Sequence, residues 1–353
     1  MKSIKFKNAA CASVLLALVT MFMGCSDSIP NNEIHYTSTD GNIVEILSYK
    51  NYHYKGNTYY SAEDVSNTYK DGKGVIRFKD ELNEIPECTF YYSRTLKTVD
   101  FPKSVTSIGN AAFAYTKNLK AIAIPENVVS IGSNAFLYSG LDSINIPESV
   151  TFIGADAFGG CNFTSIIIPN SVKELQWKIF VDCKNLTYVH LPDNITEIPE
   201  GIFNGCTSLP SVEIPESVTL IGWGAFRDCT SLRHIVIPDN VTEINLYAFE
   251  NCTSLSRIVI PNKVTKIEDG AFTGCDNLES VIIGSNVQEI ATTAFGNCKN
   301  LSEIHFLCTT PPYANSLSGY WLRTDVTLYV PRGCKEAYSQ ADFWNEFAHI
   351  IEE

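Results

Sequence analysis

Apolar residues recur at a fixed interval through most of the chain, and phenylalanine marks that interval best. Successive phenylalanines lie 22 or 23 residues apart, at 90, 113, 136, 158, 180, 203, 226, 249, 272 and 295. Proline keeps the same interval at 102, 125, 147, 169, 192, 215, 238 and 261, and Gly284 takes the next place. A fixed period of this length is typical of a solenoid, in which each repeat forms one coil stacked on its neighbours.

Within one repeat, apolar and polar positions alternate over a short stretch. In "LRHIVIP" at 232–238, His234 and Val236 point away from the apolar residues between them, which indicates a strand with one buried face. Pro238 ends that strand because proline has no N–H for the ladder. A second apolar stretch begins at Val241, and a short helical or irregular segment from Phe249 leads to the next strand.

The alternation predicts twelve strands along the chain. They end at Phe78, Phe101, Ile124, Ile146, Ile168, Leu191, Ile214, Ile237, Ile260, Ile283, Phe306 and Val330. At the usual spacing between strands, twelve of them give a curved rod roughly 50–55 Å long. Upstream, residues 33–74 carry Asp-Gly and Gly-Asn turn signals among tyrosines and threonines, and predict one or two hairpins.

The repeat resembles a known family. Its pattern Leu-x-x-Ile-x-Ile-Pro-x-x-Val-x-x-Ile-Gly-x-x-Ala-Phe-x-x-Cys is similar to the BspA-like leucine-rich repeats of bacterial surface proteins, over about residues 75–306. The tail "PPYANSL…HIIEE" resembles the C-terminal cap of many such proteins. The resemblance implies an α/β repeat solenoid, with a parallel sheet on the concave face and short irregular or helical segments opposite. It also implies a role in adhesion to host matrix or to other bacteria.

The N-terminus predicts export. Lys2, Lys5 and Lys7 precede an apolar stretch that is short for a membrane span, and "FMGC" at 22–25 resembles the lipobox of bacterial lipoproteins. In that interpretation Cys25 is lipidated after removal of the signal peptide, although the first lipobox position is Phe22 rather than leucine. A plain secretory signal cleaved elsewhere is the alternative.

These features divide the chain into five parts and predict where it resides. The parts are a lipoprotein signal peptide 1–24, a lipid-anchored tether 25–32, an N-terminal cap 33–74, repeats 75–308 and a C-terminal cap 309–353. The predicted location is the bacterial outer membrane, with the repeats exposed on the cell surface and the protein monomeric. A formal net charge of −13 argues against nucleic acid as a partner, because phosphates are repelled by an acidic surface.

Seven cysteines follow the repeat phenylalanine by three residues: Cys161, Cys183, Cys206, Cys229, Cys252, Cys275 and Cys298. Earlier repeats have Ser93, Thr116 and Ser139 at this position, so we interpret it as a packing position filled by free, buried thiols. Disulfides between neighbouring coils are the alternative in an exported protein. A disulfide between Cys308 and Cys334, which would staple the C-terminal cap, is likewise open.

The sequence offers little for catalysis. It contains no paired C-x-x-C zinc ligands and no His-Glu-x-x-His, P-loop, G-x-S-x-G or dinucleotide fingerprint, so we expect no enzyme, metal or cofactor. His190 and Glu213 are expected to be neighbours on adjacent strands, either as a solvated pair or as a metal or acid–base pair. Trp177 and Trp223 are candidates for sugar-stacking platforms, with packing at the rim as the alternative.

The outward central positions of successive strands form a column, which becomes apolar toward the C-terminus. It holds Asp100, Ala123, Asn145, Ile167, His190, Glu213, Val236, Val259, Ile282 and His305. The apolar part is flanked by His234, Arg257 and Glu279. An apolar strip with a polar rim is typical of a binding face, although strand propensity alone is an alternative explanation.

These residues lead to a functional hypothesis. The chain is predicted to bind a protein or a glycan through His190, Glu213, the apolar strip, its three flanking residues and His305. The alternative is a structural spacer or periplasmic assembly component with no ligand of its own. A hydrolytic enzyme is the third alternative, and no catalytic constellation supports it.

Overall fold

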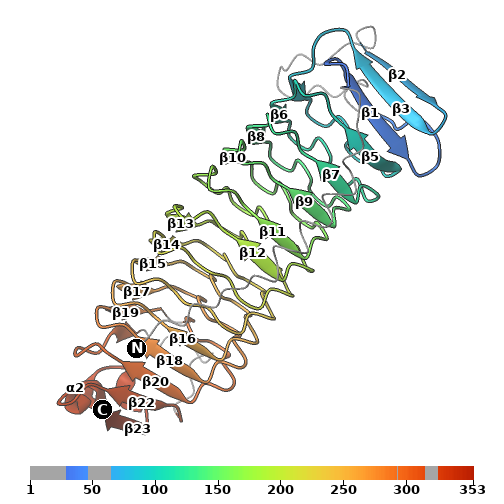
Figure 1. Cartoon of the computed structure of the whole chain (residues 1–353). Helices are drawn as coiled ribbons and strands as arrows, with labels where there is room; N and C mark the ends of the chain where they lie inside the picture. The colour runs from blue at the N-terminus through green and yellow to red at the C-terminus, as the bar shows by residue number, and fades with distance from the viewer. Residues whose placement is uncertain (1–28, 47–64, 292, 315–324) are drawn as a thin grey trace, which may run out of the picture.

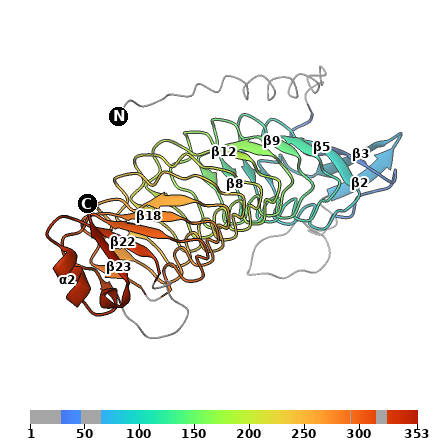
Figure 2. The same cartoon turned by 90° about the horizontal axis from the view of Figure 1, so that it is seen from below.

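The computed structural model describes residues 29–46, 65–291, 293–314 and 325–353. It is an elongated solenoid of about 11 turns with a repeat spacing of about 23 residues (Figure 1). An antiparallel sheet lies at one end and a small helix-containing cap at the other (Figure 2). The predicted solenoid is therefore confirmed. The predicted signal peptide 1–24 and Cys25 lie outside the described residues.

The N-terminal end is a four-stranded antiparallel sheet in the order β2-β3-β1-β5. Its strands are β1 (Glu33–Ser38), β2 (Val65–Lys70), β3 (Lys73–Phe78) and β5 (Leu96–Asp100). The strands β2 and β3 form a hairpin whose turn residues Asp71 and Gly72 both have left-handed backbone, at φ 52° and 80°. A two-residue turn of this kind matches the twist of the paired strands.

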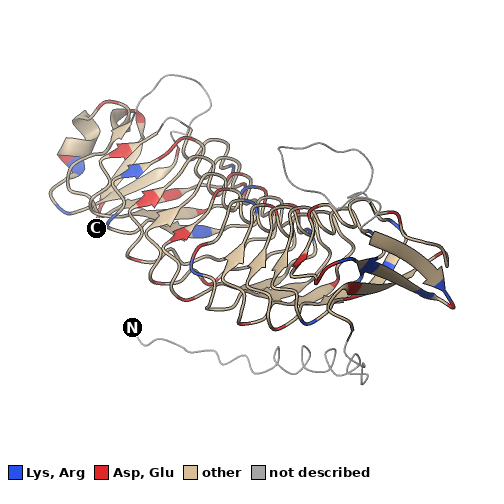
Figure 3. Ribbon diagram, turned by 90° about the horizontal axis from the view of Figure 1, so that it is seen from above, with Lys and Arg blue, Asp and Glu red and all other residues tan. Residues whose placement is uncertain are grey.

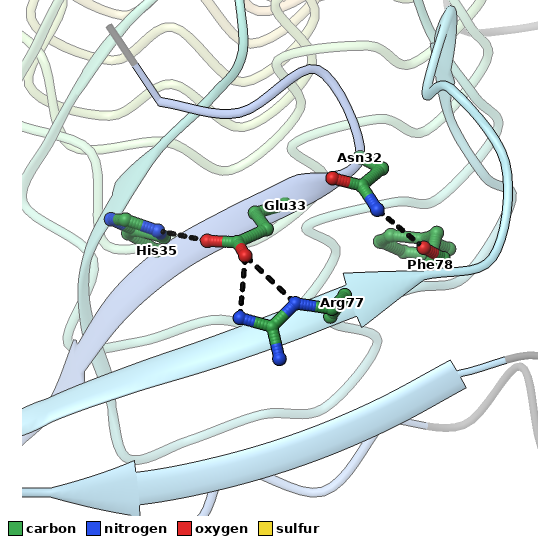
Figure 4. Close-up of polar contacts among 5 residues, drawn as sticks. All are labelled: Asn32, Glu33, His35, Arg77 and Phe78. Carbon is green, nitrogen blue, oxygen red and sulfur yellow. Dashed lines mark hydrogen bonds and ion pairs between the residues drawn. The ribbon is translucent and has the colours of Figure 1, made fainter.

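The buried carboxylate of Glu33 links strands of this sheet through side-chain hydrogen bonds (Figure 4). Glu33 accepts hydrogen bonds from His35 Nε2 at 2.8 Å and from Arg77 Nε at 2.8 Å. Burial acts to raise the pKa of Glu33, but the bonds from His35 and Arg77 outweigh it and hold that pKa below its ordinary value. Beside this cluster, Asn32 Nδ2 donates to Phe78 O at 2.9 Å, so β1 and β3 are tied by side chains as well as by their ladder.

Each coil has three sides, and parallel strands stack on two of them. The longer strands form the major sheet: β7 (Ala121–Ala123), β9 (Ser143–Asn145), β11 (Ser165–Ile167), β12 (Tyr188–His190), β16 (Arg257–Val259), β18 (Ser280–Ile283), β20 (Glu303–Phe306), β22 (Thr327–Val330) and β23 (His349–Glu352). Two-residue strands form the minor sheet: β4 (Glu84–Ile85), β6 (Ser107–Ile108), β8 (Ser130–Ile131), β10 (Phe152–Ile153), β13 (Glu197–Ile198), β14 (Leu220–Ile221), β15 (Glu243–Ile244), β17 (Lys266–Ile267), β19 (Glu289–Ile290) and β21 (Tyr313–Ala314).

The ladder of the major sheet is broken between β9 and β11, and it is interrupted for longer where two predicted strands do not form. The segments ending at Ile214 and Ile237 are not assigned as strands, so the major sheet has no strand between its β12 and β16. Pro210 lies at the start of the first segment and has no N–H with which to bond the coil before it. The alternation of the sequence predicted both strands, but the missing donor weakens the ladder at the first of them.

The third side consists of turns rather than helices. Around Phe226, Gly224 and Asp228 have φ 55° and 58°, and two such left-handed residues prevent a helical run through the phenylalanine. Hydrogen bonds instead join coil to coil, as from Phe226 N to Ala248 O at 2.8 Å. Among the described residues, helix is confined to α2 (Lys335–Gln340) and the 3₁₀ turn η2 (Trp344–Glu346). The α/β description is therefore not confirmed.

The core is a column of stacked phenylalanine rings running the length of the solenoid. Neighbouring ring centroids from Phe90 to Phe295 are 5.2–6.0 Å apart, with interplanar angles of 3–25°. At the C-terminal end, Trp344 is buried and donates its Nε1–H to Pro312 O at 2.7 Å. This cap covers the last coil, so the column does not end in solvent.

Candidate functional site: the exposed face of the major sheet

The apolar part of the central column lies on the exposed face of the major sheet. The side chain of Val236 is 62% exposed and that of Val259 is 48% exposed. Strand register pairs Val259 with Ile282 and Ile282 with His305, so these side chains form one continuous row. The adjoining inward positions, such as Ile258 and Ile260, are buried in the core. The row, in which Val236 and Val259 are exposed and Ile282 is half-buried, is thus additional to the residues that fill the core.

The row continues beyond the predicted residues into the C-terminal strands. His305 pairs with Tyr329, and Tyr329 pairs with Ile351 on β23. The rings of His305 and Tyr329 are stacked at 4.4 Å, and His305 Nδ1 is 2.9 Å from Glu353 Oε1. Tyr329 and Ile351 were not predicted for the site. The alternation of "TLYV" and "HIIE" was the available signal, but β23 is separated from β22 by a helix.

The polar rim differs from the prediction at one position. His234 and Arg257 are exposed beside the row, as expected. Register places Ser280, rather than Glu279, opposite both Arg257 and Glu303. Glu279 is exposed but precedes β18, where its backbone bonds to Ser256 and Ser302. Charged residues of both signs lie on and around the strands at the C-terminal end (Figure 3).

His190 and Glu213 are not brought together by strand pairing. His190 ends β12 and pairs with Ile167, whereas Glu213 lies in the segment that forms no strand. Within the described ranges there is no group of three or more histidine, cysteine, aspartate or glutamate residues that could hold a metal ion. The described part of the chain also has no helix long and apolar enough to cross a bilayer.

The cysteine column lies inside the solenoid, away from this face. All seven residues from Cys161 to Cys298 are buried and have free thiols. Each thiol donates to the carbonyl of the repeat phenylalanine in the preceding coil: Cys229 Sγ is 3.1 Å from Phe203 O, for example. Burial raises the pKa of Cys161 and Cys298 to about 12. The position therefore packs a neutral donor and presents no thiolate for chemistry.

Two further cysteines and two tryptophans were singled out by the sequence. Cys308 and Cys334 are both buried free thiols, and the structure has no disulfide between them. Cys308 instead contacts Tyr338, whose hydroxyl donates to Cys308 O at 2.9 Å. Trp223 is half-buried and packs edge-on against Tyr247, whereas Trp177 is half exposed beside a cavity.

Comparison with known proteins agrees with this geometry. The profile of the "BspA type Leucine rich repeat region" matches residues 74–187 and 177–302, in six copies. A leucine-rich repeat protein from Bacteroides ovatus has a similar crystal structure, with 26% identity, a TM-score of 0.64, and coverage of 89% of this chain and 81% of its own. The pneumococcal vaccine antigen PcpA has 22% identity, a TM-score of 0.54 and 77% coverage of each chain. No curated protein matches the chain.

Proposed function

The chain belongs to the BspA-type leucine-rich repeat family, and on this basis we propose that it is a cell-surface protein that recognises another protein through the exposed face of its major sheet. A lipid on Cys25 anchors it in the bacterial outer membrane, and residues 25–32 serve as the tether. The repeats at 75–308 then carry the binding face, between the caps at 33–74 and 309–353. The proposed role is adhesion.

The observation that carries the proposal is the apolar row of Val236 and Val259, which are exposed, and Ile282, which is half-buried. An apolar strip bordered by polar residues is the arrangement that protein interfaces use, because its burial on binding releases water from apolar surface. Tyr329 and Ile351 lengthen the row to the end of the sheet. The C-terminal half of the face is therefore the part that we assign to the partner.

Strand propensity does not account for the row. At the same column position, β7 has Ala123, β9 has Asn145 and β12 has His190, and all three form paired strands. A valine or isoleucine is thus not needed at this position for a strand to form. The two valines at Val236 and Val259 do not fill the core either, because about half or more of each side chain is exposed.

Substitution on the row tests the proposal. The purified protein is measured by surface plasmon resonance against a panel of extracellular-matrix proteins, together with a Val236→Asp/Val259→Asp variant. We expect binding to at least one panel member and at least a tenfold loss in the variant, because two charges would be buried without partners. Ala123→Asp introduces the same charge in the same column far from the row, and should change affinity less than twofold.

Two outcomes contradict the proposal. If the double variant and Ala123→Asp bind as wild type does, the row is not the binding face. If the wild type binds no panel member, the chain behaves as a spacer with no ligand of its own. Urea unfolding of both variants is the folding control, and we expect little change because all three positions are exposed.

A further inference from the structure

The minor sheet is broken at a single coil in the middle of the solenoid. It runs as β4-β6-β8-β10 and then as β13-β14-β15-β17-β19-β21, with no strand in the coil between β10 and β13 (Figure 1). The stacked phenylalanine rings are farthest apart at the same place. The ring centroid of Phe180 is 6.0 Å from that of Phe158 and 5.8 Å from that of Phe203, whereas those of Phe226 and Phe249 are 5.2 Å apart.

The break lies in a column of residues whose backbone N–H groups join neighbouring coils elsewhere in the minor sheet. Gly109, Gly132 and Gly222 each donate an N–H to the isoleucine carbonyl of the preceding coil at 2.7–2.8 Å. A Cβ at any of these three glycines would lie only 2.7–2.8 Å from backbone atoms of that coil. Asn245 and Ala291 make the same bond later in the column, to Ile221 O at 2.9 Å and to Ile267 O at 2.8 Å. The broken coil has Gln176 in this column, and the next coil has Pro199, which has no N–H to donate.

The break opens a cavity of about 420 Å³ on the surface of the solenoid. Its lining is Leu175, Gln176, Trp177, Glu197, Pro199 and Glu200. Trp177 presents a large indole surface, because 48% of its side chain is exposed. The volume is within the range of about 300–1,000 Å³ that is usual for sites of small ligands.

The lining combines one aromatic platform with planar polar groups. An indole face packs well against the C–H groups of a pyranose ring. The Gln176 amide can both donate and accept, and the carboxylates of Glu197 and Glu200 accept hydrogen bonds from hydroxyls. Because a sugar offers apolar C–H groups beside a set of hydroxyls, it matches both halves of this lining.

Other classes of ligand fit the cavity less well. Two carboxylates repel an anionic ligand. A cation is already present, because Lys178 Nζ lies 5.1 Å from the centroid of the Trp177 ring and 3.5 Å from Glu200 Oε1. That ammonium partly neutralises the carboxylate of Glu200, so a cationic ligand would gain less from the cavity. A neutral ligand with several hydroxyl groups therefore fits the cavity best.

We propose that this cavity is a glycan-binding subsite, in which Trp177 packs against a neutral sugar ring and Gln176, Glu197 and Glu200 bind its hydroxyls. The subsite is on the minor-sheet side, separate from the apolar row on the major sheet. It is therefore independent of the proposed recognition of a protein, and either site can be lost without the other.

A matched pair of tryptophan variants tests the subsite. Saturation-transfer NMR with the full protein uses the methyl glycosides of glucose, galactose, mannose, N-acetylglucosamine and N-acetylgalactosamine, with choline as the cationic probe. We expect at least one glycoside to bind and Trp177→Ala to weaken it at least tenfold. Trp223→Ala removes the same residue type two coils further on, outside the cavity, and should leave the affinity unchanged within twofold.

Gln176→Ala is a second test of the subsite, because it removes the amide and keeps the indole of Trp177. We expect it to weaken glycoside binding several-fold without changing the urea midpoint. The proposal is overturned if no glycoside binds at millimolar concentration, if choline binds instead, or if Trp177→Ala and Trp223→Ala behave alike. Retained binding of a matrix protein in Trp177→Ala would leave the major-sheet proposal intact.

Discussion

At the scale of single residues, the position three after each repeat phenylalanine is defined by size and by one donor. Serine, threonine and cysteine are all small and can all donate, as Thr116 does to Phe113 O at 2.7 Å and Cys252 does to Phe226 O at 3.1 Å. Cysteine adds an apolar surface to the donor, which suits a buried position. The packing role of this position could therefore be predicted from the residue types alone.

The cysteine column leads to a prediction about reactivity. Alkylation requires a thiolate, and burial raises the pKa of the column thiols well above the ordinary 9.0. We expect iodoacetamide at pH 8 to modify Cys88, which is half-buried, while the seven column cysteines react only after unfolding in urea. Mass spectrometry of the alkylated peptides measures this. Column cysteines that react as fast as a peptide thiol, or that are found oxidised in pairs, would contradict the free, buried column.

At the scale of elements, backbone bonds from the column that contains Gly109, Gly132 and Gly222 join neighbouring coils on the minor side. The period of the phenylalanines was enough to predict the number and order of the coils. The break was harder to predict, although Gln176 and Pro199 are both visible in the sequence, because the consequence appears only when coils are stacked. Similarly, Pro210 in the major sheet removes a donor whose acceptor is in another coil.

Substitution by alanine is therefore expected to have different effects at two places in this column. Gly132→Ala brings a Cβ to 2.7 Å from Asn110 N, and should lower the free energy of unfolding by about 1–3 kcal/mol through overpacking. Gln176→Ala, where the sheet is already open, should change it by less than about 0.5 kcal/mol. Urea denaturation of the two variants provides the comparison. Equal losses of stability at both positions would contradict this expectation, because the coils would then pack as tightly around residue 176 as around Gly132.

At the scale of the whole molecule, the array is continuous even though both sheets are interrupted. The phenylalanine stack passes through each interruption, so every coil remains in contact with its neighbours, as expected of a solenoid. The overall architecture was predictable because it repeats one pattern many times. The site was predictable only where it follows the repeat, at Val236, Val259 and Ile282. Tyr329 and Ile351 belong to the cap, where the period ends.

The proposed recognition depends on display at the cell surface, since the binding face meets host or neighbouring-cell proteins only outside the cell. Protease treatment of intact cells, followed by mass spectrometry for peptides from residues 75–308, tests it most directly, with a periplasmic protein as the control. We predict that these peptides are released from unbroken cells while the control stays intact. Protection of the repeats until the cells are lysed would contradict the account and would place the array in the periplasm.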